Sequence, residues 1–214
     1  MADTDQFRSS PLFARFHEWT SRRRSSIAYF DEYRRTLAQM ASGRVLELGA
    51  GGGQNFPYFD PERVSEVEAT EPESTMLGYA HSHLSESRVP VHLTQATAEH
   101  LPFDTGTFDT VLATLVLCSV HDLQRTLSEV ARVLKPDGRL LLLEHVRSPQ
   151  HWVARMQTAF TPLQRRMAGN CHLNRDIRDA LLQAGFTIEM ERHCSGGFLP
   201  MRIYAARRPS APLP

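Results

Sequence analysis

Three glycines at alternate positions follow a short apolar run and an acidic residue. The run Val45–Leu48, with Glu47 as the acid, leads into Gly49, Gly51 and Gly53. Glycine lets the backbone turn sharply and lets a ligand lie against bare main chain. The spacing differs from the dinucleotide-binding pattern G-x-G-x-x-G, whose third glycine comes one residue later. The loop indicates either a small-molecule binding site or a plain turn.

A second acidic residue, Glu71, follows the next apolar run, Glu66–Thr70, and comes twenty-two residues after Gly49. A carboxylate at that point of a nucleoside-binding α/β fold can accept hydrogen bonds from both hydroxyls of a ribose. The alternative is a surface acid in a turn before Pro72. Position and residue type agree with the binding role, which we predict.

Histidine and cysteine side chains are the candidates for acid–base chemistry. His145 ends an apolar run, and its imidazole titrates near neutrality, so it is either a base or a substrate-orienting residue, or it only bonds a neighbouring backbone group. Cys171 and His172 form either part of a substrate wall or, as the pattern favours, the turn before a helix that Asn174 would cap. Cys118 is predicted to pack at a strand end.

Short apolar runs alternate with helical patterns along residues 41–206, which indicates an α/β fold with a mostly parallel sheet between helices. Helical periodicity covers Leu123–Leu134, which ends at the turn signal Pro136-Asp137-Gly138, and a further helix is expected over Arg175–Ala184. The expected strands are Arg44–Leu48, Glu66–Thr70, Val91–Gln95, Phe108–Thr114, Arg139–His145, Thr187–Arg192 and Met201–Ala206.

Three segments lie outside this alternation. Residues 1–40 read as helical and are predicted to form a lid or flank over the binding cleft, with simple surface packing as the alternative. An insertion at about residues 148–170 has apolar side chains at helical spacing, which predicts either a packed helix or a cap over an apolar substrate. The proline-rich residues 207–214 are expected to be a disordered tail. The apolar residues of the insertion are Trp152, Val153, Met156, Phe160, Leu163 and Met167.

Composition excludes several classes of protein. No apolar run approaches the length of a membrane span, and the polar first residues do not read as a secretory signal. Three widely spaced cysteines favour reduced thiols in a cytoplasmic protein, and without a Cys-x-x-Cys pair we predict no metal site. A net charge of zero argues against nucleic acid binding. Ten arginines against four acids over residues 147–208 leave contact with an anionic substrate or lipid surface open.

Together the motifs resemble class I S-adenosylmethionine-dependent methyltransferases of type 11. The E-x-G-x-G-x-G run resembles motif I of that family, and Ala96–Phe103 resembles its segment that packs against adenine, although many relatives have Asp in place of Thr97. The resemblance covers residues 44–145 and implies S-adenosylmethionine as cofactor and a Rossmann-like seven-stranded sheet whose last strand is antiparallel. The cofactor-binding residues that it implies are Glu47, Gly49, Gly51, Gly53, Glu71, Pro72, Met76, Thr97, Ala98, Glu99, Thr114 and Leu115.

Three further blocks, Leu115–Val120, Leu143–Val146 and Gly169–Arg175, resemble a methyltransferase-like group whose vertebrate members methylate alkyl thiols at membranes and lipid droplets. The chain differs from the membrane-bound members because it lacks their hydrophobic N-terminal anchor, so only peripheral membrane contact is considered. The resemblance implies a small, fairly apolar acceptor, and a thiol must be deprotonated before it can attack.

The reaction itself stays open between S-methylation of a thiol, N-methylation of a phospholipid amine and C-methylation of a quinone precursor. A sensor that binds the cofactor without turnover is the alternative from another class. His145, Cys171 and His172 are the candidate catalytic residues. The sequence makes no prediction about oligomeric state.

Overall fold

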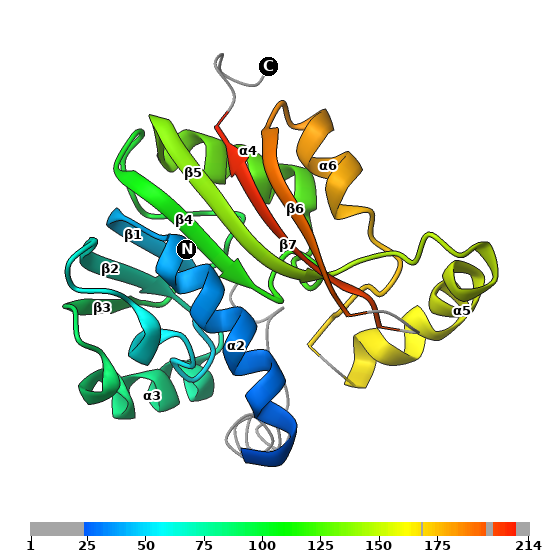
Figure 1. Ribbon diagram of the computed structural model, residues 1–214, viewed down its shortest axis with the longest axis horizontal. Coiled ribbons are helices and arrows are strands. Elements are labelled where there is room, and N and C mark those ends of the chain that lie inside the picture. Colours follow the sequence, from blue (N-terminus) through cyan, green and yellow to red (C-terminus); the bar gives the residue numbers. More distant parts are fainter. Residues whose placement is uncertain (1–23, 168, 196–198, 209–214) are drawn as a thin grey trace.

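The computed structural model describes residues 24–167, 169–195 and 199–208, and in this part of the chain seven strands form one sheet (Figure 1). The strand order is β3-β2-β1-β4-β5-β7-β6, and only β7 runs antiparallel to its neighbours. This confirms the predicted sheet and its antiparallel last strand. The strands are β1 (Gly43–Leu48), β2 (Val64–Thr70), β3 (Val91–Thr94), β4 (Phe108–Thr114), β5 (Leu134–His145), β6 (Thr187–Ser195) and β7 (Met201–Arg207).

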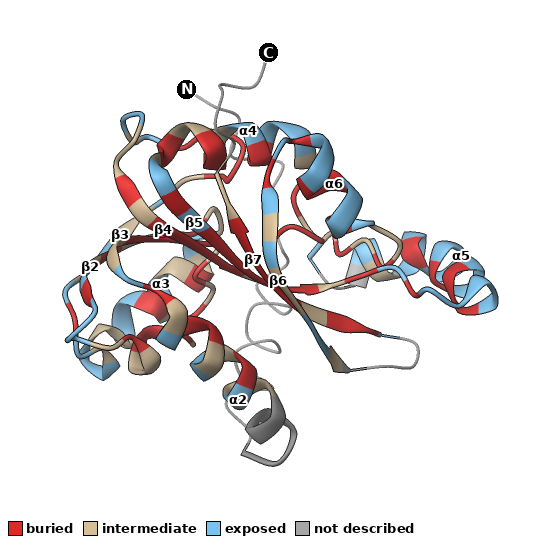
Figure 2. Ribbon diagram, turned by 45° about the horizontal axis from the view of Figure 1, so that its top comes forward, coloured by how far each residue is buried: buried red, intermediate tan, exposed pale blue. Residues whose placement is uncertain are grey.

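Helices cover both faces of the sheet (Figure 2). One face packs against α2 (Arg24–Met40) and α3 (Ser74–Ser82), and the other against α4 (Leu123–Val133) and α6 (Ile177–Gln183). Successive residues of β5 serve the two layers in turn, because side chains alternate along a strand: Leu141 and Leu143 face α2, and Leu140 and Leu142 face α4. The helix α5 (His151–Met167) projects from the sheet (Figure 1). Short 3₁₀ turns span Phe56–Tyr58 and Leu84–Glu86.

Carboxylate side chains cap the amino-terminal ends of three helices. The side chain of Glu73 accepts hydrogen bonds from the backbone at the start of α3, and Asp122 does the same for α4. Asp176, and not the predicted Asn174, caps α6. Each carboxylate satisfies backbone N–H groups that have no partner within the helix.

The predicted turn at Pro136-Asp137-Gly138 lies inside β5. Leu134 pairs with Phe108 and Arg139 pairs with Thr110, so residues 135–138 stand opposite a single residue of β4. The turn sequence is therefore absorbed as an irregularity in the β4–β5 pairing, and the strand begins five residues earlier than expected.

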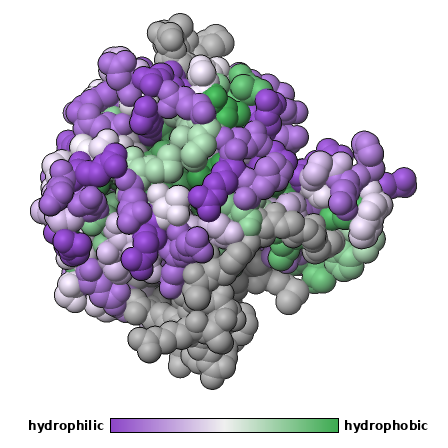
Figure 3. All heavy atoms as spheres, in the orientation of Figure 1, coloured by the Kyte–Doolittle hydropathy of each residue, from purple (hydrophilic) through white to green (hydrophobic). Residues whose placement is uncertain are grey.

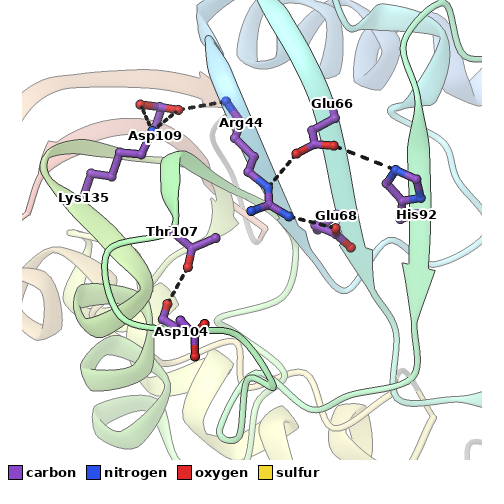
Figure 4. Close-up of polar contacts among 8 residues, drawn as sticks. All are labelled: Arg44, Glu66, Glu68, His92, Asp104, Thr107, Asp109 and Lys135. Atoms are coloured by element: carbon purple, nitrogen blue, oxygen red, sulfur yellow. Dashed lines mark hydrogen bonds and ion pairs between the residues drawn. The ribbon is translucent and has the colours of Figure 1, made fainter.

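The amino-terminal end of the sheet is held by Asp109, which is the residue opposite that irregularity. Its carboxylate accepts hydrogen bonds from Lys135 Nζ at 2.7 and 2.8 Å and from the backbone N–H of Arg44 at 2.9 Å (Figure 4). The Arg44 side chain extends the network to Glu66 and Glu68 on β2. These contacts join β1, β2, β4 and β5 at the end of the sheet opposite the glycine loop.

The structure describes only part of the two terminal segments for which a lid and a disordered tail were predicted. Residues 1–23 of the predicted lid and residues 209–214 of the predicted tail lie outside the described residues. In the described part of the amino-terminal segment, α2 buries Tyr33, Leu37 and Ala38 against the sheet. The first two residues of the predicted tail still belong to the sheet, because Arg207 pairs with Arg139 and Thr187 and the N–H of Arg208 donates to the carbonyl of Gly138 at 3.2 Å.

Candidate functional site

A cavity of about 420 Å³ lies at the carboxyl ends of β1 and β4, where the strand order reverses. Ligands of open α/β sheets bind at such a point. Most of the predicted site residues line this cavity: Gly49, Gly51, Glu71, Pro72, Met76, Ala98, Glu99, Thr114, Leu115, His145 and Cys171. Four predicted residues do not line it: Glu47, Gly53, Thr97 and His172.

The glycine loop has the backbone conformation that its sequence indicates. Gly49, Gly51 and Gly53 have φ of +58°, +58° and +83°, in the left-handed region that side chains disfavour. A Cβ added at Gly49 would lie 2.7 Å from Val116, and one at Gly51 would lie 3.0 Å from the Gln54 side chain. The loop therefore needs glycine for its backbone and leaves bare main chain against the cavity.

Glu71 lies beside the loop and is buried, with 8% of its surface exposed. Its carboxylate accepts hydrogen bonds from the backbone N–H groups of Gly51 at 2.9 Å and Glu73 at 3.0 Å. Burial raises the pKa of Glu71 to about 7, although these two hydrogen bonds act in the opposite direction. Each oxygen has a further lone pair, so the carboxylate can accept hydroxyl donors from a ligand in the cavity.

Glu47 lies beneath the loop and not in the cavity wall. It is 1% exposed, and Oε1 accepts a hydrogen bond from Asn55 Nδ2 at 2.8 Å, while burial raises its pKa to about 7. Asn55 lines the cavity and also contacts Thr114 Oγ1 and the guanidinium of Arg34. The cavity wall above Glu47 is formed by Asn55 and Arg34, which the sequence motifs did not single out.

At the end of the cavity that the resemblance assigns to adenine, Glu99 and not Thr97 faces the ligand space. Thr97 is buried and pairs through its backbone with His100. Glu99 is 6% exposed, and its Oε1 accepts the N–H of His121 at 2.8 Å. Its Oε2 is buried and has no hydrogen-bond partner, which leaves an acceptor for a donor group of a ligand.

The segment that follows β4 is organised by a buried carboxylate that the motif analysis did not assign to the site. Glu144 is fully buried, and it accepts the backbone N–H groups of Val116, Leu117 and Cys118 at 2.9, 2.7 and 3.1 Å. Burial raises the pKa of Glu144 well above its ordinary value. Leu115, which precedes these residues, has φ of +60°, an uncommon conformation of the kind found at functional sites.

A second segment, after α5, is tied to the first by polar side chains. Arg175 donates to two carbonyl groups of residues 117–120 at 2.5 and 2.6 Å, and Asn170 donates to a third at 2.7 Å. The backbone N–H of His172 donates to the carbonyl of Cys118 at 2.7 Å, and its ring lies outside the cavity. His172 therefore helps to position Cys118, and burial lowers the pKa of its imidazole.

These ties bring Cys118, His145 and Cys171 together at one end of the cavity. The two sulfur atoms are 3.6 Å apart, and Cys171 Sγ is 3.9 Å from His145 Nδ1. The contact between the thiols raises the pKa of Cys118 and lowers that of Cys171. Burial lowers the pKa of His145, but contact with Cys118 outweighs it and leaves this pKa raised. Cys118 is thus a member of the site and not only a packing residue.

The insertion helix α5 contributes little to the cavity. Among its described side chains only Gln164 lines the cavity, and Val153 is buried elsewhere against the domain. The predicted apolar wall is instead an exposed face, which Figure 3 shows as green atoms on the lobe that projects to the right. Its members are Trp152, Met156, Phe160 and Leu163.

Comparison with known proteins agrees with this geometry. Residues 46–142 match a family model described as a methyltransferase domain. The chain carries a methyltransferase domain. A putative methyltransferase from Bacillus halodurans superposes on 83% of this chain and 99% of its own with a TM-score of 0.69 and 18% identity, which shows the shared fold.

Two curated relatives extend the similarity of the methyltransferase domain at the sequence level. Human thiol S-methyltransferase TMT1B is 35% identical over 162 residues, which are 71% of this chain and 64% of that protein. The C-methyltransferase UbiE of Vibrio cholerae, of ubiquinone and menaquinone biosynthesis, is 38% identical over 106 residues, 47% of this chain and 40% of its own. The chain thus spans less than two thirds of the length of either relative.

Proposed function

We propose that this protein transfers the methyl group of S-adenosylmethionine to the sulfur of a small, fairly apolar thiol. One observation carries the proposal: a single cavity joins the glycine loop and Glu71 to the group formed by Cys118, His145 and Cys171. A methyl transfer needs the donor and the nucleophile in one enclosed space, because orientation and exclusion of water supply most of its acceleration.

The donor end has the groups that S-adenosylmethionine requires. Bare main chain at Gly49 and Gly51 leaves room for the ligand, Glu71 offers acceptors for ribose hydroxyls, and Glu99 has an unpartnered carboxylate oxygen near the position of the base. When bound, the cofactor supplies an activated methyl group on a sulfonium. The protein's part is to hold the cofactor and to generate the nucleophile.

The acceptor end suits a thiol because only the thiolate attacks readily. His145 Nδ1 lies 3.9 Å from Cys171 Sγ, and His145 lines the cavity, so its imidazole can take the proton of a thiol bound there. The similarity to human thiol S-methyltransferase TMT1B supports the same acceptor class. The similarity to UbiE supports C-methylation of a quinone precursor as the second candidate.

Transfer of a labelled methyl group from S-adenosylmethionine to a panel of acceptors tests the proposal. The panel contains an alkane thiol, a phospholipid amine and a demethylated quinone precursor. We expect label in the thiol. Label only in the quinone precursor or the amine would replace the thiol assignment, and cofactor binding without any labelled product would favour the sensor.

The role of His145 can be separated from a structural one by the pH dependence of the reaction. We expect His145→Ala to lower kcat about 10²–10⁴-fold near neutral pH, the range for loss of a general base. The defect should shrink above about pH 8.5, where a thiol ionises without help. His151→Ala is the control, because His151 is exposed at the start of α5 and does not line the cavity. A defect that is constant with pH would contradict the role of a base.

We also propose peripheral contact with a membrane through α5, since a fairly apolar acceptor partitions into lipid. Among the described residues no helix is long and apolar enough to cross a membrane. The exposed face of α5 is flanked by Arg155 and Arg166, and a helix with an apolar face and basic edges binds anionic interfaces. We expect co-sedimentation with anionic vesicles that is lost in Trp152→Glu and retained in Leu182→Glu, an exposed apolar residue on α6. Equal loss in both variants would contradict this use of α5.

A further inference from the structure

The three side chains of Cys118, His145 and Cys171 are spaced like the ligands of a metal site. Tetrahedral Zn²⁺ with Zn–S of about 2.3 Å and Zn–N of about 2.0 Å places two sulfur ligands about 3.8 Å apart, and sulfur and nitrogen about 3.5 Å apart. The observed separations are 3.6 Å between Cys118 Sγ and Cys171 Sγ and 3.9 Å between Cys171 Sγ and His145 Nδ1. The three ligand atoms all lie within 4.8 Å of one another.

We infer that Cys118 Sγ, Cys171 Sγ and His145 Nδ1 bind a thiophilic divalent cation of the Zn²⁺ type. Two thiolates and one imidazole are the donor set that such ions prefer over Mg²⁺ or Ca²⁺, which take oxygen ligands. Cys118 and Cys171 are buried, yet both border the cavity together with His145, so an ion can reach them through this cavity.

The surroundings support each ligand in the way that metal sites require. The N–H of Cys118 is held by Glu144, and its carbonyl is held by His172, so the position of its sulfur is determined by contacts outside the metal shell. Asn170 and Arg175 bind the 117–120 segment, which draws Cys171 to the same point. These contacts hold the two sulfur donors in place before any ion binds.

The described residues supply no fourth ligand. The carboxylate of Glu144, the residue before His145, is engaged by three backbone N–H groups, and the ring of His172 lies outside the cavity. Three protein ligands and one open position are characteristic of catalytic zinc sites. The open position borders the cavity, where it would take the acceptor thiol as a thiolate and release its proton to solvent. This last point rests on the proposed function, whereas cation binding does not.

Coordination and proton acceptance exclude each other at His145, because both use the lone pair of Nδ1. In the metal-bound protein the ion would therefore replace His145 as the group that keeps the acceptor ionised. A thiolate bound to a metal stays deprotonated at neutral pH.

Cobalt(II) substitution tests the inference with a readout that does not depend on activity. The full chain, reduced with a phosphine and freed of metal with a chelator, is titrated with Co²⁺ while sulfur-to-metal charge-transfer absorption is recorded. We expect one Co²⁺ per chain, displaced by Zn²⁺, with affinity reduced at least about 10-fold in Cys118→Ser and Cys171→Ser. Cys194→Ser is the control, because Cys194 is on β6 and does not line the cavity. Binding of S-adenosylhomocysteine checks that each variant is folded.

The absence of saturable Co²⁺ binding, or equal loss in Cys194→Ser, would overturn the metal site. Addition of an alkane thiol to the Co²⁺ protein should increase charge-transfer absorption, and an unchanged spectrum would overturn the open acceptor position. Methyl transfer to a thiol by protein that binds no metal would sink the inference and leave the proposed function standing. Metal binding without thiol methylation would do the reverse.

Discussion

Affinity for the cofactor should depend on pH through Glu71. This carboxyl is buried beside the glycine loop, and burial raises its pKa from 4.5 to about 7. Hydroxyl donors from a bound ribose favour the ionised form, so ligand binding lowers the pKa of Glu71 again. Binding then releases a proton below about pH 7, and affinity falls as the pH is lowered.

The size of the effect follows from the two pKa values. If binding returns the pKa of Glu71 to 4.5, the affinity at pH 5 is about 70-fold lower than at pH 8. Stability of the ligand-free protein changes in the opposite direction. A raised carboxyl pKa contributes stability that is present below about pH 4.5 and lost as the pH rises through about 7, here roughly 3 kcal/mol.

Calorimetric titration with S-adenosylhomocysteine from pH 5 to pH 8 measures the first effect. We expect Glu71→Gln to remove most of the pH dependence, and Glu62→Gln, an exposed carboxyl away from the cavity, to retain it. Titration of the ligand's own groups cancels in this comparison. Parallel profiles for wild type and Glu71→Gln would refute the placement of the ribose at Glu71.

Three further predictions rest on other contacts. Gly51→Val should abolish binding of S-adenosylhomocysteine in calorimetry, whereas Gly106→Val, with φ of +69° and open space around its Cβ, should bind normally; equal affinities would contradict the loop assignment. Glu144→Gln should lower the free energy of unfolding in urea by about 1–3 kcal/mol, because the NH₂ group of the glutamine would face the N–H of Cys118 and leave that donor without an acceptor. An unchanged midpoint of urea unfolding would contradict this. Burial raises the pKa of Asp109, but Lys135 and Arg44 outweigh it and leave the pKa lowered, so its contribution to stability is present above about pH 4 and lost as the pH falls further. Asp109→Asn should show a smaller loss of stability in acid than wild type.

The fold was predictable because the hydrophobic pattern and the turn residues agree with the sheet almost everywhere. Leu140–Leu143 is apolar on both faces, and the structure places these residues between two helical layers. The exception is residues 135–138, where Pro136 and Gly138 indicated a turn. A local signal of this kind cannot show that neighbouring strands will pair on both sides of it and absorb it.

The cofactor end of the site was predictable where it is formed by backbone at the ends of strands. Gly49, Gly51 and Glu71 sit at strand ends whose position follows from the topology. Glu47, near the end of β1, and Thr97, in the loop after β3, are both buried outside the cavity wall. Asn55 and Glu99, which line the cavity, come from the loops that follow, where the strand pattern makes no prediction.

At the acceptor end of the site, too, the sequence predicts some of the neighbours and not others. Cys118 follows the carboxyl end of β4 and His145 is the last residue of the neighbouring strand β5, so their proximity follows from the sheet order once that order is known. Cys171 comes from a segment outside the strand pattern, and side chains such as Arg175 and Asn170 bring it there. No spacing rule connects residues 118, 145 and 171, since none of the separations resembles a metal-binding motif. A search limited to such motifs misses this group, and the same tertiary ties that hide it from the sequence make it rigid enough to bind an ion or activate a thiol.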